Sequence, residues 1–257
     1  MDDKLEFYLD AKDILSQPTS CQAQGDYKKA LEKEITEHRI AKMEISPLRG
    51  NYDLDHLSKI HEKIFEHIYD WAGEVRLDDI SKRAIDPNGN YEIGHFLDKN
   101  LIPDELNKFS QAVKEKDHLK GLDKDQFVQE FTQLYAKLNE AHPFEEGNGR
   151  AAKLMMNQLA NDAGYTMVYS KVAVSDWNYA FKRSLTDQEL YVGENYENLE
   201  PMEQDLSYLL KVMDSIIEPY DLVLKLENTE EQEQEQEQDK EKEKPPSNPN
   251  QPEPPFA

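Results

Sequence analysis

Apolar residues recur at three- and four-residue spacing through most of the chain, which is the pattern of helices that bury one face. The clearest example covers residues 53–72, where Asp53 is suited to cap the first turn and Gly73 to end the last. Its apolar stripe consists of Leu54, Leu57, Ile60, Ile64, Phe65, Ile68 and Trp71. Similar patterns predict helices over residues 26–44, 95–116, 123–141, 148–163, 175–184 and 201–217. We therefore expect a mainly helical protein.

Residues 80–95 have a different pattern. Isoleucine and tyrosine residues there flank the turn-forming run Asp-Pro-Asn-Gly-Asn at positions 86–90. Asn-Gly is a strong signal for the tight turn of a β-hairpin. The sequence therefore predicts a short hairpin among the helices.

From about residue 228 the chain consists of Glu/Gln repeats, then Lys/Glu, then Pro and Asn. Such a segment cannot bury enough apolar surface to offset the entropy lost on ordering. We expect it to be disordered. It contributes −6 to the net charge of −23, so −23 − (−6) leaves −17 on residues 1–227.

An acidic body bears on the class of partner. Nucleic-acid binding needs a basic face, and none is visible, so we expect no nucleic-acid partner. No apolar run approaches the length of a bilayer span, so we expect no membrane association. Residues 1–16 lack the features of a signal peptide, and Cys21 is the only cysteine. The expected localisation is cytoplasmic, with export into a host or neighbouring cell left open.

The strongest chemical signal is the run His-Pro-Phe-Glu-Glu-Gly-Asn-Gly-Arg at residues 142–150, between two predicted helices. The first N–H groups of a helix lack intrahelical partners and favour an anion. Gly147 and Gly149 leave room for a phosphate to approach them, and Arg150 adds a fork for phosphate oxygens. A nucleotide can bind such a local cradle in spite of an acidic surface.

Two further residues of this run suit phosphoryl or nucleotidyl transfer to a hydroxyl. Glu146 immediately precedes the cradle, and a carboxylate beside phosphates is a typical ligand of Mg²⁺. His142 has a side chain that titrates near neutrality and can take a proton from an attacking hydroxyl. Pro143 and Phe144 have structural roles, ending the helix and anchoring the loop. By contrast, the spacing of His56, His61 and His67 does not place them on one helical face, which favours satisfied or surface histidines over a metal site.

These nine residues match the Fic family signature His-x-Phe-x-[Asp/Glu]-Gly-Asn-Gly-Arg at every defined position. Residues 57–65 and 68–76 resemble the first core helix of that family and its exit, and residues 80–95 resemble its flap. The resemblance covers roughly residues 45–217. It divides the chain into a helical extension at 1–44, a Fic catalytic domain at 45–219 and an acidic, Pro-rich disordered tail at 220–257.

The resemblance implies an all-α bundle with a short β-hairpin flap, and a protein adenylyltransferase that uses ATP and Mg²⁺. Such enzymes transfer AMP to a Ser, Thr or Tyr hydroxyl of a target protein and release pyrophosphate. The flap at residues 80–95 would dock the target. The implied roles are general base for His142, metal ligand for Glu146, phosphate contacts for Gly147, Asn148, Gly149 and Arg150, and nucleotide contacts for Lys82, Glu145 and Lys153.

The chain departs from the family pattern at Lys153, where a second arginine is usual. Lysine keeps the charge and loses the two-pronged geometry, so we expect weaker control of the γ-phosphate. The inhibitory motif [Ser/Thr]-x-x-x-Glu-[Gly/Asn] is not found in the sequence. This suggests that inhibition is absent or comes from a separate small antitoxin-like partner. A toxin or secreted effector is the expected context.

Two other functions stay open at this point. The same fold could transfer another phosphate-containing group, as in phosphorylation. Alternatively, the domain could be a catalytically weak module that binds a nucleotide or a partner.

Overall fold

The structure of the chain is a computed structural model, which describes residues 22–86, 89–192 and 198–221. Residues 1–21 of the expected extension and residues 222–257 of the expected tail lie outside the described part. The helices are α2 (Gln22–Ile45), α3 (Leu54–Phe65), α4 (Ile102–Glu115), α5 (Lys124–Ala141), α6 (Asn148–Asp162), α7 (Val174–Arg183) and α8 (Ser207–Ile216). Short 3-10 turns lie at η1 (Lys99–Leu101), η2 (Asp117–Leu119) and η3 (Tyr169–Lys171). The prediction of a mainly helical protein is confirmed.

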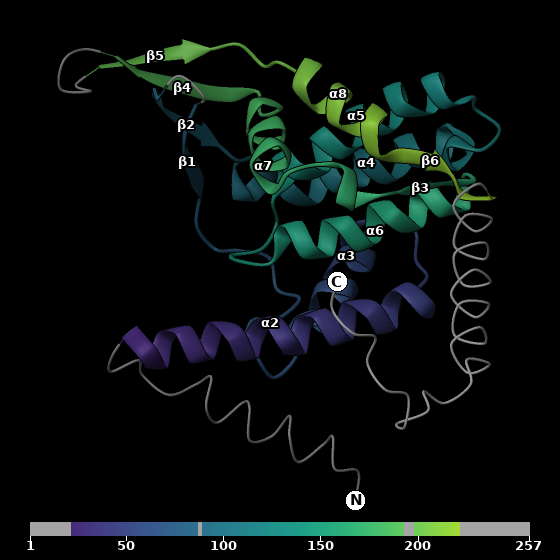
Figure 1. The fold of residues 1–257 in the computed structure, drawn as a ribbon, viewed down its shortest axis with the longest axis horizontal. Helices are drawn as coiled ribbons and strands as arrows, with labels where there is room; N and C mark the ends of the chain where they lie inside the picture. Colours follow the sequence, from purple (N-terminus) through teal and green to yellow (C-terminus); the bar gives the residue numbers. More distant parts are fainter. Residues whose placement is uncertain (1–21, 87–88, 193–197, 222–257) are drawn as a thin grey trace, which may run out of the picture.

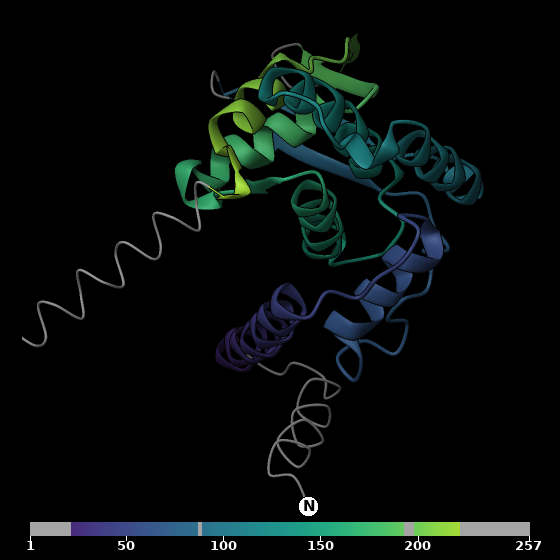
Figure 2. The same cartoon turned by 90° about the vertical axis from the view of Figure 1, so that its right-hand side faces the viewer.

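Helix α6 is central to the bundle (Figures 1 and 2). It packs against α3 and α5, and α2 lies beside α3 and contacts both α3 and α6. Fully buried side chains of α6 include Met155, Met156 and Leu159, and they meet the phenylalanines of α5 in one core. Fully burying a side chain of this size stabilises the fold by about 1.5–3 kcal/mol. The core therefore fixes α6 in place, and with it the loop that enters its N-terminal end.

A small antiparallel sheet stands at one end of the bundle, with strand order β1-β2-β4-β5. Strands β1 (Ser81–Ile85) and β2 (Tyr91–His95) pair from Ser81 opposite His95 to Ile85 opposite Tyr91, which confirms the predicted hairpin. The sequence did not predict β4 (Asp187–Val192) and β5 (Asn198–Met202), which extend the hairpin into a sheet. Strands β3 (Tyr165–Met167) and β6 (Ile217–Pro219), also not predicted, form a separate pair.

Four predicted helix bounds are wrong, and the first is that of the helix expected at 26–44, which begins at Gln22. Helix α3 ends at Phe65 instead of residue 72, because the chain turns at His67 with φ 67°. Tyr69 and Trp71 still pack on the core from this turn, so the apolar spacing continues beyond the helix itself. The helix expected at 95–116 begins at residue 102, after β2 and η1, and the one expected at 201–217 begins at residue 207, after β5.

The expected N-cap at Asp53 is confirmed, whereas Asp26, the N-cap expected for the helix at 26–44, lies inside α2. The side chain of Asp53 accepts a hydrogen bond from the backbone N–H of His56, and Asp123 accepts one from that of Gln126. Among the described residues, none of the helices has the length and apolarity that a bilayer crossing requires.

Candidate active site

The signature loop joins α5 to α6. His142 ends α5 in the left-handed region, with φ 39° and ψ 61°, and its N–H reaches the carbonyl of Leu138 at 3.4 Å. This backbone conformation costs a residue other than glycine about 1–2 kcal/mol of conformational free energy. Contacts from outside the loop stabilise it, because Arg76 donates from Nε to the His142 carbonyl at 2.9 Å and from its backbone N–H to that of Pro143 at 2.8 Å.

The ring of His142 is neutral and held in one orientation by its neighbours. It stacks on Phe96 with the ring centroids 3.7 Å apart, and its Nδ1 lies 3.2 Å from the carbonyl oxygen of Asn139. A carbonyl oxygen only accepts, so Nδ1 holds the proton and Nε2 keeps a lone pair. Burial lowers the pKa of His142 from 6.5 to about 4, and the charges of Lys82 and Arg76 also lower it, against the opposing effect of the Asn139 bond.

Two side chains hold the shape of the loop from inside. The amide of Asn148 is buried and bonds both backbone groups of Phe144: its Oδ1 accepts from the N–H at 2.8 Å, and its Nδ2 donates to the carbonyl at 2.7 Å. Phe144 is fully buried and stacks on His61, with centroids 3.9 Å apart. The side chain of Asn148 thus braces the loop, which leaves only its backbone N–H for a phosphate.

His61 links α3 to the same loop. Its Nδ1 accepts from the N–H of Gly73 at 2.9 Å, and its Nε2 donates to the carbonyl of Glu146 at 2.9 Å. Burial lowers the pKa of His61 from 6.5 to about 4, so the ring is neutral. His56 is buried with both ring nitrogens bonded to the backbone as well. These two histidines are therefore satisfied structural residues, as their spacing indicated.

The two glycines differ in what they require. Gly147 has φ 80°, and a Cβ there would lie 2.3 Å from Cε2 and Cζ of the fully buried Phe65. A Cβ at Gly149 would meet nothing within 4 Å. Gly147 is therefore required by backbone and packing, whereas Gly149 faces open space at the first turn of α6.

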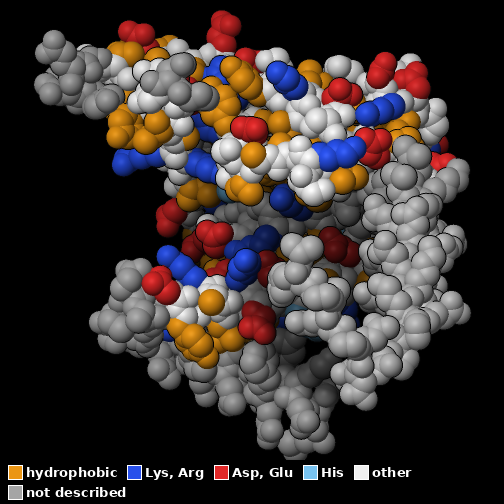
Figure 3. Space-filling view, viewed as in Figure 1, with side chains coloured by type: hydrophobic (Ala, Val, Ile, Leu, Met, Phe, Trp, Pro, Cys, Tyr) orange, Lys and Arg blue, Asp and Glu red, His pale blue; other side chains and the backbone are white. Residues whose placement is uncertain are grey.

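That space is a cavity of about 460 Å³. Figure 3 shows this face of the molecule hollowed between α2 and the elements above it, beside the start of α6. Of the residues expected at the site, seven line the cavity: Lys82, His142, Glu145, Glu146, Gly147, Asn148 and Gly149. The fold therefore brings the predicted base, carboxylates, glycines and flap lysine around one volume.

Helix α7 supplies a wall of the cavity that the sequence did not reveal. Trp177, Asn178 and Phe181 line it from this helix, and Tyr135 and Leu138 line it from α5. Their spacing matches any amphipathic helix, so no signal in the sequence distinguished them from ordinary core residues. Together with the glycine-lined helix end, they complete the lining of the cavity with mainly apolar side chains.

Arg150 points toward α2. Its Nη1 lies 2.9 Å from Oε1 of Glu32 and 3.3 Å from Oγ1 of Thr36, and its guanidinium carbon lies 4.5 Å over the Phe65 ring. Its Nη2 is 3.6 Å from the carboxylate of Glu146. The expected phosphate ligand is thus already paired with an acid from the N-terminal helix, which the sequence had not indicated.

Lys153 lies one turn further along α6 and holds its ammonium between aromatic rings. Nζ is 4.6 Å from the ring centroids of both Tyr169 and Trp177. Burial lowers the pKa of Lys153. Cation–π contacts with these two rings stabilise the charge against that burial, and Lys153 itself does not line the cavity.

The chain is thus a helical bundle in which a glycine-containing helix N-terminus and a neutral histidine line one cavity. The chain belongs to the Fic/DOC family, whose model matches residues 51–160. It is 36% identical over 148 residues to the "Probable protein adenylyltransferase Fic" of Salmonella typhimurium, covering 57% of this chain and 68% of that one. It is 38% identical over 125 residues to the "Protein adenylyltransferase VbhT" of Bartonella schoenbuchensis, covering 49% of this chain and 24% of that protein. The chain thus spans about a quarter of VbhT.

Solved structures show the same fold. The BepC protein of Bartonella tribocorum with bound AMPPNP superposes with a TM-score of 0.55 at 23% identity, covering 73% of this chain and 87% of that chain. The N-terminal Fic domain of a cell filamentation protein of Bartonella quintana with bound ADP superposes with a TM-score of 0.59 at 23% identity. That match covers 75% of this chain and 86% of the other. The fold expected from the sequence is confirmed.

Proposed function

We propose that the protein is a protein adenylyltransferase that transfers AMP from ATP to a hydroxyl group of a target protein. One observation supports this above all: the neutral ring of His142 and the N-terminal end of α6 face the same cavity. A base and an anion cradle on one volume suit the attack of a hydroxyl on a phosphate. The names of the relatives in the same family agree with this activity.

In the proposed reaction the hydroxyl oxygen attacks the α-phosphorus of ATP. Nε2 of His142 takes the hydroxyl proton as the new O–P bond forms, and the bond from the α-phosphorus to pyrophosphate breaks. The backbone N–H groups at the start of α6 hold the phosphates, and Gly149 keeps their approach open. Lys82 and Glu145 line the cavity where the nucleotide would bind.

The residues present fit a magnesium ion. The carboxylate of Glu146 is 64% exposed at the rim of the cradle, and its Oε1 accepts from the N–H of Gly147 at 2.9 Å. Mg²⁺ prefers one or two carboxylates together with phosphate oxygens and water. We therefore propose Glu146 as its ligand, and the ion would neutralise phosphate charge there.

The target would dock on the flap at residues 80–95. Strand β1 lies at the edge of the sheet, so its outer backbone groups can pair with an added strand. Strand addition fixes the position of the target hydroxyl with little demand on sequence. We also propose a cytoplasmic protein with a separate small antitoxin-like inhibitor, which co-purification from the native host would test.

The activity is tested with ATP labelled at the α or the γ phosphate, incubated with the protein and a lysate. Adenylylation places the α label on a target, whereas the γ label on a target would indicate phosphorylation and contradict the proposal. His142→Ala should abolish labelling while the melting temperature stays close to wild type. His38→Ala, at an exposed position of α2, is the matched control and should label normally. Labelling that survives in His142→Ala would remove this residue as the base.

A further inference from the structure

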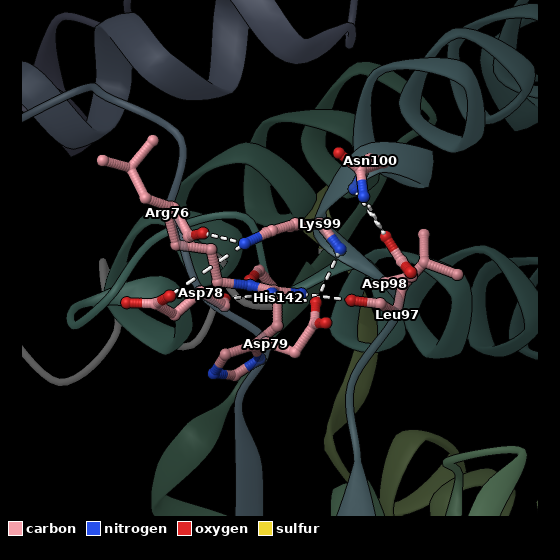
Figure 4. A network of polar contacts seen from close by, with 9 residues as sticks. Arg76, Asp78, Asp79, Leu97, Asp98, Lys99, Asn100 and His142 are labelled. Carbon is pink, nitrogen blue, oxygen red and sulfur yellow. Dashed lines mark hydrogen bonds and ion pairs between the residues drawn. The ribbon is translucent and has the colours of Figure 1, made fainter.

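Arg76 lies almost fully buried, at 3% exposure, in the segment between α3 and β1. Its guanidinium donates to three backbone carbonyls: Nε to His142 at 2.9 Å, Nη1 to Asp78 at 2.6 Å, and Nη2 to Leu97. Figure 4 shows the three carbonyls converging on this one side chain, with the His142 ring directed away from the network.

The three carbonyls belong to segments with different roles. Asp78 lies three residues before β1 and Leu97 lies two residues after β2, so these residues flank the two ends of the flap hairpin and are called its feet here. His142 is the proposed base at the end of α5. One rigid, planar group therefore joins both feet of the flap to the residue that would take the proton.

Neighbouring contacts tighten the same junction. The backbone N–H of Leu97 donates to the carbonyl of Glu140 at 2.9 Å, and that of Lys99 donates to Oδ1 of Asp79 at 2.9 Å. Phe96, next to Leu97, stacks directly on the His142 ring. A shift of the flap feet would therefore move the surface against which the imidazole rests.

The cost of this arrangement argues that it serves the site. A buried charge is expensive unless well bonded, and the nearest carboxylate, Asp79, is 3.5 Å away with its side chain 61% exposed. Hydrogen bonds from a charged donor are stronger than those between neutral groups, and they offset the burial only while all three carbonyls stay in place. The guanidinium thus fixes the strained backbone of His142 relative to the flap.

We propose that Arg76 is a positioning residue that couples the flap to His142 and so fixes the position of the base relative to the hydroxyl of a target docked on the flap. This inference rests on the proposed function. It concerns how the reaction geometry is held, and Arg76 itself touches neither nucleotide nor target.

The decisive variant is Arg76→Lys, which keeps the charge and loses the fork. We expect kcat to fall about 100-fold, as for a misplacement of about 1 Å, and the KM for ATP to change less than threefold. The KM for the target protein should rise, because the flap feet are no longer tied together. Arg49→Lys, which alters an exposed arginine paired with Asp162, is the matched control and should behave as wild type. A wild-type kcat in Arg76→Lys would overturn the proposal. A fall in kcat no larger than the fraction of the variant that is unfolded would overturn it as well, because it would reflect lost folding alone.

A second readout does not need activity. The pKa of the His142 imidazole is measured by NMR titration in wild type, Arg76→Lys and Arg76→Met. The charges facing the ring are Lys82 of β1 and Arg76. The pKa should stay low in Arg76→Lys and rise in Arg76→Met, and the ring contact with Phe96 should weaken in both. An unchanged ring environment in folded Arg76→Met would refute the coupling. If wild type labels no target, the proposed function fails, and this titration still decides the role of Arg76.

Discussion

Gly147 and Gly149 stand two residues apart in one loop, and replacing each by alanine should have opposite effects. In Gly147→Ala the new methyl would lie 2.3 Å from two ring carbons of Phe65 at φ 80°. Normal contact between carbons is about 3.5–4.0 Å, so a fully buried ring or the loop must move by roughly 1.2 Å or more. The left-handed backbone adds about 1–2 kcal/mol, and overpacking about 1–3 kcal/mol.

The sum is a loss of about 2–5 kcal/mol in the free energy of unfolding. For a domain of this size each kcal/mol lowers Tm by about 2–4 °C, so a loss near 3 kcal/mol corresponds to roughly 10 °C. In Gly149→Ala the methyl enters open space on a helix, and alanine there stabilises by about 0.4–1 kcal/mol. The same methyl would obstruct the approach of a phosphate to the helix N-terminus and should weaken ATP binding at least about tenfold.

Thermal unfolding measures the first effect, and titration calorimetry with a non-hydrolysable ATP analogue and Mg²⁺ measures the second. The expected pattern is an unstable Gly147→Ala and a stable Gly149→Ala that binds poorly. A Gly149→Ala protein with wild-type affinity would show that the phosphates do not lie over this helix end. A Gly147→Ala protein with wild-type Tm would show that the contact with Phe65 imposes no constraint.

Three further predictions concern groups around the site. Glu32→Gln should tighten ATP binding about fivefold, because the partly exposed ion pair between Glu32 and Arg150, worth about 1 kcal/mol, no longer competes with phosphate for the guanidinium. Weaker or equal ATP binding in calorimetry would contradict this. Lys182→Met should cost about 3–5 kcal/mol in urea unfolding by leaving Glu92 of β2 charged and buried, and the double variant with Glu92→Gln should recover much of it. The pKa of His61 is about 4 in the folded protein against 6.5 in the unfolded chain. Its neutral ring therefore stabilises the fold fully above pH 6.5, and the free energy of unfolding falls by about 3 kcal/mol as the pH drops from 6.5 to 4. A His61→Gln protein whose stability falls as steeply over this range as that of wild type would refute the assignment.

The features that the sequence predicted correctly depend on short stretches of chain. Asp53 caps α3 by accepting from the N–H group three residues further on, and the Asn-Gly hairpin needs only its own two strands. The signature loop is local in the same sense, since Asn148 closes it on Phe144. Interactions of this range can be recognised from spacing and residue type alone.

The features that were missed depend on partners distant in the chain. Strand β4 forms because β2 offers it a pairing edge, and β5 then pairs with β4, although its Pro201 breaks a strand pattern. Proline is accepted there because β5 lies at the edge of the sheet. Glu32 and Trp177 reach the site from α2 and α7, whose own patterns resemble those of any helix that packs on a core.

The distribution of charge bears on which part of the proposed site would contact a nucleotide first. With a formal net charge of −23, the protein as a whole opposes an approaching triphosphate. The two cations of α6 are committed elsewhere, Arg150 to Glu32 and Lys153 to the rings of Tyr169 and Trp177. The backbone N–H groups beside Gly149 have no such competitor within the helix, because the first N–H groups of any helix lack acceptors there. Under the proposed function, we therefore expect the helix end to capture the nucleotide first, with Arg150 contributing once phosphate has displaced Glu32.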